Sequence, residues 1–125
     1  MSQQSATYYV NVLERGEHWD TSRPMRQQEQ WEEHVAFLDA LTDDGLILGG
    51  GPLGEEEKRF LLVIAAENQQ AIETRLADAP WTRLGVWRTV SVERWEVLLG
   101  SRLYQAVTSS SPHTIYRLWT PFGCW

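Results

Sequence analysis

Apolar and polar positions in the first half of the chain predict a strand, a helix and a second strand. Residues 7–13, TYYVNVL, are rich in aromatic and β-branched types, which favour strands. Apolar residues then recur at helical spacing over 31–41, after Pro24, which suits a first helical turn, and before Gly45, which suits a helix C-terminus. Residues 46–48 form a short apolar run that stops at a run of glycines, so we expect a short second strand.

The second half of the chain repeats this order. The polar run 55–59 predicts a hairpin loop, and residues 60–66, FLLVIAA, form the clearest strand. Asn68 is a candidate N-cap for a helix over 69–77. In residues 86–99, apolar and polar positions alternate, which predicts a last strand. Its two faces are expected to carry Val86, Val90 and Val92 on one side and Trp87, Thr89 and Ser91 on the other.

The resulting order, βαββαβ, predicts an α+β, ferredoxin-like domain over 1–100, with an antiparallel sheet and both helices on one face. The other sheet face needs a cover, so we expect a homodimer that joins two sheets. Residues 101–125 follow as an apolar C-terminal extension behind a serine-rich linker. We expect Trp119, Phe122 and Trp125 to be partly buried against the domain, the partner subunit or another protein, unless the extension is an artefact without a structural role.

Composition narrows the function mainly by exclusion. A length of 125 residues fits one domain, and 42% hydrophobic residues with seven tryptophans are typical of a soluble globular protein. The net charge of −6 repels nucleic acid and anionic membrane surfaces, so neither is expected as a partner. The single cysteine, Cys124, cannot form an internal disulfide, and neither a signal peptide nor a membrane span is recognisable. We therefore expect a cytoplasmic protein.

Two motif-like patterns are rejected on physical grounds. The spacing G-x-G-x-x-G over 49–54 matches a dinucleotide-binding loop, but Pro52 lacks an amide hydrogen and glutamates follow instead of a helix. The acidic stretch around His18 and Asp20 has no recurrent metal-ligand spacing and is better explained as a polar loop. We expect neither a cofactor nor a metal.

His34 is the main candidate for chemistry. It lies three residues after Trp31 and four before Leu38, so it belongs to the apolar stripe that faces the sheet. A histidine there is either a core residue bonded to the backbone or a general acid or base, because imidazole titrates near neutral pH. The residues alone leave both interpretations open.

Four segments of the chain resemble the YCII-related domain family: W..HVAFLDAL..DG.ILGGGPL, RFLLVIAAE, RLADAPWTRLGV and VERWEVLLG. The resemblance covers residues 8 to about 100. The resemblance implies a ferredoxin-like fold, a dimeric α/β barrel and a pocket in which a histidine, here His34, pairs with an aspartate. The family has this aspartate directly before a proline, whereas the present chain reads Asp78-Ala79-Pro80. One residue turns a helix by about 100°, so Asp78 reaches His34 only if the turn is rearranged.

This resemblance implies cofactor-independent acid–base chemistry by His34 and Asp78, such as isomerisation or dehydrohalogenation of a small carbonyl or hydroxylated ring compound by a lyase or isomerase. If the pair does not form, the alternative is a non-catalytic module that binds a small ligand or another protein. Further candidate ligand-binding residues are Gly51, Pro52, Arg26, Arg88, Trp31 and Trp81. The arginines would anchor an anionic group, unless they only solvate a face, and the tryptophans either fill the core and dimer interface or stack on a flat substrate.

Overall fold

The computed structural model describes residues 7–100 and has the α+β architecture predicted from the sequence. The strands are β1 (Thr7–Arg15), β2 (Ile47–Leu53), β3 (Arg59–Ala66) and β4 (Trp87–Trp95). The helices are α1 (Trp31–Asp43), α2 (Gln69–Leu76) and α3 (Pro80–Leu84), and a 3-10 turn, η2 (Met25–Gln27), precedes α1. The sheet has the ferredoxin-like order β2-β3-β1-β4, with every neighbouring pair antiparallel. The extension 101–125, with Trp119, Phe122 and Trp125, lies outside the described residues.

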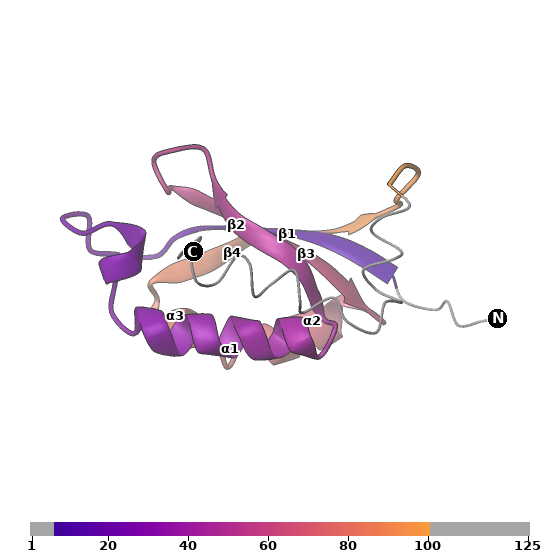
Figure 1. The fold of residues 1–125 in the computed structure, drawn as a ribbon, viewed down its shortest axis with the longest axis horizontal. Helices are drawn as coiled ribbons and strands as arrows, with labels where there is room; N and C mark the ends of the chain where they lie inside the picture. Colours follow the sequence, from indigo (N-terminus) through magenta and orange to yellow (C-terminus); the bar gives the residue numbers. More distant parts are fainter. Residues whose placement is uncertain (1–6, 101–125) are drawn as a thin grey trace.

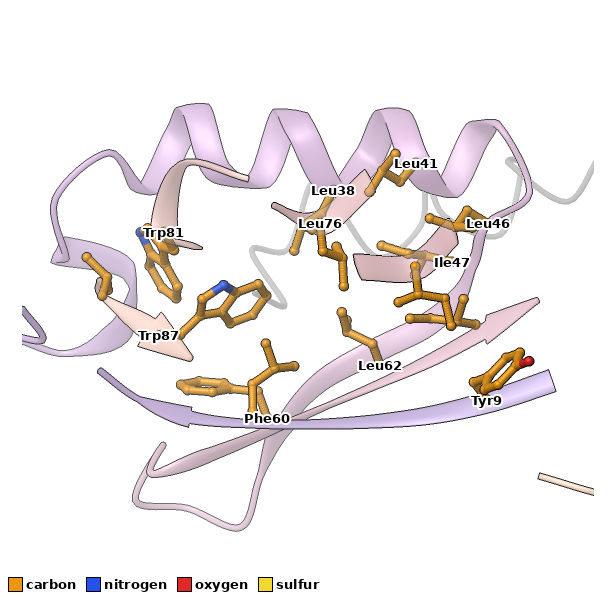
Figure 2. Close-up of a cluster of buried hydrophobic side chains, with 14 of the residues drawn as sticks. Tyr9, Leu38, Leu41, Leu46, Ile47, Phe60, Leu62, Leu76, Trp81 and Trp87 are labelled. Atoms are coloured by element: carbon orange, nitrogen blue, oxygen red, sulfur yellow. The ribbon is translucent and has the colours of Figure 1, made fainter. Parts of the chain in front are cut away.

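The helices cover one face of the sheet (Figure 1), and the strands alternate between that face and the opposite one. On β3, Phe60, Leu62 and Ile64 point toward the helices and are buried, whereas Leu61 and Val63 lie half-buried on the opposite face. The helices contribute Leu38, Leu41, Ile72 and Leu76 to the same core (Figure 2). We call the face without helices the outer face. No helix within 7–100 has the length and apolar character that crossing a membrane requires.

Helix α1 begins at Trp31, not near Pro24 as the sequence predicts. Pro24 instead precedes η2, and the chain is extended again at Gln28. The buried Gln28 side chain accepts a hydrogen bond from the Asp20 amide at 2.9 Å and donates to the Asp20 and Arg23 carbonyls at 2.8 Å each. A helix through this segment would break these bonds and leave the buried Gln28 side-chain amide without partners. Helix α1 therefore begins about two turns later than predicted.

Two strands also differ from their predicted limits. Strand β2 does not stop at the glycines: Gly49 and Gly51 pair with Val63 and Leu61 of β3, because glycine keeps both backbone hydrogen-bonding groups. Strand β4 ends at Trp95. Its register against β1 slips by one residue between Thr89 and Ser91, which leaves Val90 unpaired.

This bulge overturns the predicted faces of β4. Before it, Trp87 points into the core, and beyond it Val92 packs against the same core. Val90, which was expected beside Val92, has 54% of its surface exposed. An extra residue in one strand reverses the alternation behind it, so the two predicted faces are mixed.

The predicted start of α2 and the predicted end of α1 agree with the structure. The Asn68 side chain caps α2 by accepting a hydrogen bond from the Ala71 amide at 2.8 Å. Helix α1 ends just before Gly45, which takes a left-handed conformation with φ of 88°.

Candidate functional site

His34 lies on the face of α1 that covers the sheet, and only 1% of its surface is exposed. Its ring stacks on the Trp81 indole, with ring centroids 4.4 Å apart and planes 8° apart. The edge of Trp87 meets the same ring at 4.4 Å and 88°. Nδ1 of His34 accepts a hydrogen bond from the backbone N–H of Trp81 at 3.4 Å. The histidine is therefore held by two aromatic rings and one backbone amide.

These contacts belong to a larger aromatic cluster at one end of the core, part of which is labelled in Figure 2. We define the aromatic cluster as Trp19, Trp31, Phe60, Trp81 and Trp87. Trp81 lies at its centre, with its ring centroid 5.6–6.4 Å from those of the four other members. Offset and edge-on contacts of this kind stabilise aromatic pairs by about 0.5–1.5 kcal/mol beyond the burial of their area.

The short helix α3 brings Trp81 to His34. Ala79 precedes it in an extended conformation, Pro80 occupies its first turn, and Gly85 ends it with φ of 78°. The loop after β1 packs tightly on this turn: the Gly16 amide donates to the Val86 carbonyl at 2.8 Å. A Cβ atom on Gly16 would lie 2.2 Å from the Gly85 oxygen, so only glycine permits this approach.

Burial determines the charge of His34. Desolvation lowers the pKa of the imidazole from 6.5 to about 3, because the charged form loses its hydration. The ring is therefore neutral at physiological pH. Since Nδ1 accepts from the Trp81 amide, the single proton of the neutral ring is assigned to Nε2. In this state His34 presents a hydrogen-bond donor, and its basic nitrogen is occupied.

Three buried polar side-chain atoms have no hydrogen-bond partner within 7–100: His34 Nε2, Trp19 Nε1 and Asn11 Oδ1. Two of them, on His34 and Trp19, belong to side chains that contact the Trp81 ring. A buried polar group without a partner costs about 1–3 kcal/mol. Such atoms indicate a place where a ligand or an ordered water completes the structure.

The predicted pair of His34 with Asp78 is not confirmed. The Asp78 side chain is 69% exposed, and its carboxylate lies 3.7 Å from Arg83. Within residues 7–100, the hydrogen bond of the His34 side chain is with the Trp81 amide and not with Asp78. The position directly before Pro80 belongs to Ala79, which is completely buried. The position at which the resemblance implies an aspartate is therefore buried and holds a methyl group in this chain.

The other candidate residues fall into three groups. Trp31 and Trp81 lie in the aromatic cluster with His34, and Pro52 on β2 pairs with Phe60, a member of that cluster. Gly51 pairs with Leu61, whose side chain lies on the outer face. The remaining two, Arg26 and Arg88, are exposed, and Arg88 donates to Glu14 at 2.6 Å.

Trp19 and Trp87 are the members of the site that the sequence did not assign to it. Trp19 lies in the polar stretch after β1, and a large apolar ring in such a stretch was the available signal of burial. The sequence placed Trp87 on one face of the last strand and did not name it among the candidate binding residues. Within 7–100, no group of three or more His, Cys, Asp or Glu side chains is arranged to hold a metal ion.

Comparison with known proteins identifies the family. No curated protein matches the chain. Among solved structures, the 5-chloro-2-hydroxyhydroquinone dehydrochlorinase TftG from Burkholderia phenoliruptrix AC1100, in complex with 2,5-dihydroxybenzoquinone, is 21% identical, with a TM-score of 0.49 over 76% of this chain and 97% of that one. The structural-genomics protein YJCS is 14% identical, with a TM-score of 0.44 over 74% and 99%. The model of the YCII-related domain matches residues 8–96, and the chain therefore belongs to this family.

Proposed function

We propose that this protein binds a small oxygen-bearing ring compound at His34, and that neutral His34 donates a hydrogen bond to it from Nε2. The observation that carries this proposal is the buried, unpartnered Nε2 atom. A ligand oxygen at this atom would recover the hydrogen bond that the folded chain leaves unmade. The surrounding indole rings suit a flat ligand, because aromatic faces stack on one another.

A neutral imidazole donor also has a chemical use. A hydrogen bond to a ring carbonyl draws electron density toward the oxygen and stabilises an enolate or phenolate as it develops. This assistance requires neither a metal nor a cofactor, and it does not require a carboxylate beside His34. Proton transfer on the ligand would then need a separate base, so His34 alone accounts for binding and polarisation.

Acid–base chemistry by His34 and Asp78 is the second candidate. In its favour, Asp78 lies three residues before Trp81, and its contact with Arg83 is long and exposed. Such a surface pair contributes at most about 1 kcal/mol, so it offers little resistance to a rearranged turn. A carboxylate at Nδ1 would replace the Trp81 amide, raise the pKa of His34 and leave Nε2 as the base.

A binding experiment tests the first candidate. We expect 4-hydroxybenzaldehyde, a ring compound with a carbonyl and a hydroxyl group, to shift the side-chain nitrogen resonances of His34. Substitution His34→Phe keeps an aromatic ring but removes the donor, and it is expected to weaken binding about tenfold, which corresponds to one lost hydrogen bond. Trp95→Phe, on a side chain that is 38% exposed, is the matched control. Equal binding by wild type and His34→Phe would contradict the proposal.

We further propose that the protein is a cytoplasmic homodimer joined through the outer face of its sheet. This face carries the half-buried residues Val10, Val12, Leu61 and Val63, and the described helices all cover the other side. Light scattering is expected to give about twice the chain mass of 14.4 kDa. Val63→Lys should reduce this to the mass of one chain with an unchanged circular dichroism spectrum. A wild-type monomer at micromolar concentration would refute the dimer.

A further inference from the structure

The aromatic cluster contains two buried N–H donors that no described residue accepts. They are Nε2 of His34 and Nε1 of Trp19. Both side chains contact the Trp81 indole: His34 stacks on its face at 4.4 Å, and Trp19 meets it at 80° with centroids 5.8 Å apart. The two side chains that carry an unused donor therefore contact one and the same ring.

The remaining N–H donors of the cluster show that burial alone does not leave a donor unused. Nε1 of Trp81 donates to the Glu29 carbonyl at 2.9 Å, and Nε1 of Trp87 donates to the Thr82 hydroxyl at 2.9 Å. Partners from nearby backbone and side chains are thus available at this end of the core. The absence of partners is therefore selective. Within the described part of the aromatic cluster it affects the donors of His34 and Trp19 and not those of Trp81 and Trp87.

We propose that Trp19 is a second ligand-binding residue of the His34 site, and that the ligand carries a planar group with two acceptor oxygens and no donor. One oxygen accepts from His34 and the other from Trp19. This inference rests on the proposed function, because it names the class of compound that the site accepts. A carboxylate, a nitro group or a ring with two carbonyls has the required acceptors.

Charges of both signs lie near Trp19 and do not decide between an anionic and a neutral ligand. The Arg15 guanidinium lies 4.7 Å above the Trp19 ring and donates to the Glu56 and Glu57 carbonyls. The Glu57 carboxylate lies near the segment that follows Trp19, because it accepts a hydrogen bond from the Met25 amide at 2.9 Å. The ligand is therefore defined by its acceptor geometry, and its net charge is left to the experiment. Both donors are buried, so a ligand reaches them only when a neighbouring group moves, and association is expected to be slow.

Three flat probes of one shape separate these properties: benzoate is an anionic acceptor, nitrobenzene is a neutral acceptor, and benzamidinium is a donor. Each is added to the full chain, and the indole Hε1 resonance of Trp19 and the imidazole resonances of His34 are followed by nitrogen-edited NMR. We expect both residues to shift with benzoate or with nitrobenzene, and neither to shift with benzamidinium. If only benzoate shifts the two residues, the ligand is anionic. If benzoate and nitrobenzene both shift them, the ligand is neutral. Either result supports the inference.

Substitution Trp19→Phe keeps a ring but removes the donor, and it is expected to weaken binding of the acceptor probe about tenfold, whereas Trp95→Phe leaves it unchanged. If His34 shifts while Trp19 does not, and Trp19→Phe binds as well as wild type, the inference about Trp19 is wrong and the proposed function stands. If no probe shifts either residue, or if bound water stays on both donors in the presence of every probe, both proposals are wrong. The wild-type spectra alone distinguish these outcomes should Trp19→Phe fail to fold.

Discussion

Replacing Trp81 with alanine is expected to lower the free energy of unfolding by about 3–5 kcal/mol, the usual cost of removing a large buried aromatic side chain. Trp81 is 1% exposed and lies at the centre of the aromatic cluster. Its removal takes away the stacking surface of His34 and leaves a cavity that Trp19, Phe60 and Trp87 cannot all fill. Part of the loss comes from burial, and part from the edge-on and stacked contacts of the ring.

Urea denaturation followed by circular dichroism measures this loss. The control is Trp95→Ala, because Trp95 lies on the outer face with 38% of its surface exposed, and its loss should be well below that of Trp81→Ala. Trp81→Phe fills part of the cavity and is expected to fall between the wild type and the alanine variant. A Trp81→Ala variant within about 1 kcal/mol of wild type would show that the cluster is not tightly packed.

Acidification from pH 7 to pH 5 is expected to cost the wild type about 2 kcal/mol of stability through His34 alone. Burial lowers the pKa of the folded imidazole to about 3, whereas the unfolded chain keeps the ordinary value of 6.5. Above pH 6.5 both states are neutral and the group contributes nothing to the pH dependence. Below pH 6.5 the unfolded state binds the proton and the folded state does not, so stability falls until the pH approaches 3.

The pH dependence can be isolated by comparing variants at the two pH values. His34→Gln removes the titrating ring, so its loss of stability between pH 7 and pH 5 should be smaller than that of wild type by about 2 kcal/mol. His18→Gln removes an exposed histidine and is the matched control for the loss of an imidazole outside the aromatic cluster. Identical pH profiles for wild type and His34→Gln would mean that the folded imidazole is not desolvated.

Local patterns in the sequence were sufficient for much of the fold. The apolar run 60–66 predicted β3 to within one residue, and Asn68 predicted the start of α2. The start of α1 was wrong because it depends on the Gln28 side chain and its bonds to a preceding loop. The faces of β4 were wrong because a bulge at Val90 arises from pairing with β1, which no local pattern encodes.

The candidate site likewise has features that the sequence predicted and features that it could not predict. Helical spacing was enough to orient His34 toward the sheet, since this depends on its own helix. Its tautomer depends on the backbone amide of Trp81, 47 residues away, and so could not be predicted from neighbours in sequence. Asp78 illustrates the same limit, because the direction of its side chain is set by the turn between α2 and α3. Recognising Trp19 as part of the site required knowing which strand end its loop packs against.

The protonation of His34 tests most directly whether the site works with a neutral donor or with an acid–base pair. Nitrogen-edited NMR of the imidazole ring, recorded between pH 3 and pH 8 in wild type and in Asp78→Asn, reports both the pKa and the tautomer. The buried, Trp81-bonded ring predicts a pKa far below 6.5, near 3, with the proton on Nε2 and no change in Asp78→Asn. A wild-type pKa near or above 6.5 that falls in Asp78→Asn, with the proton on Nδ1, would contradict the neutral donor and establish the pair.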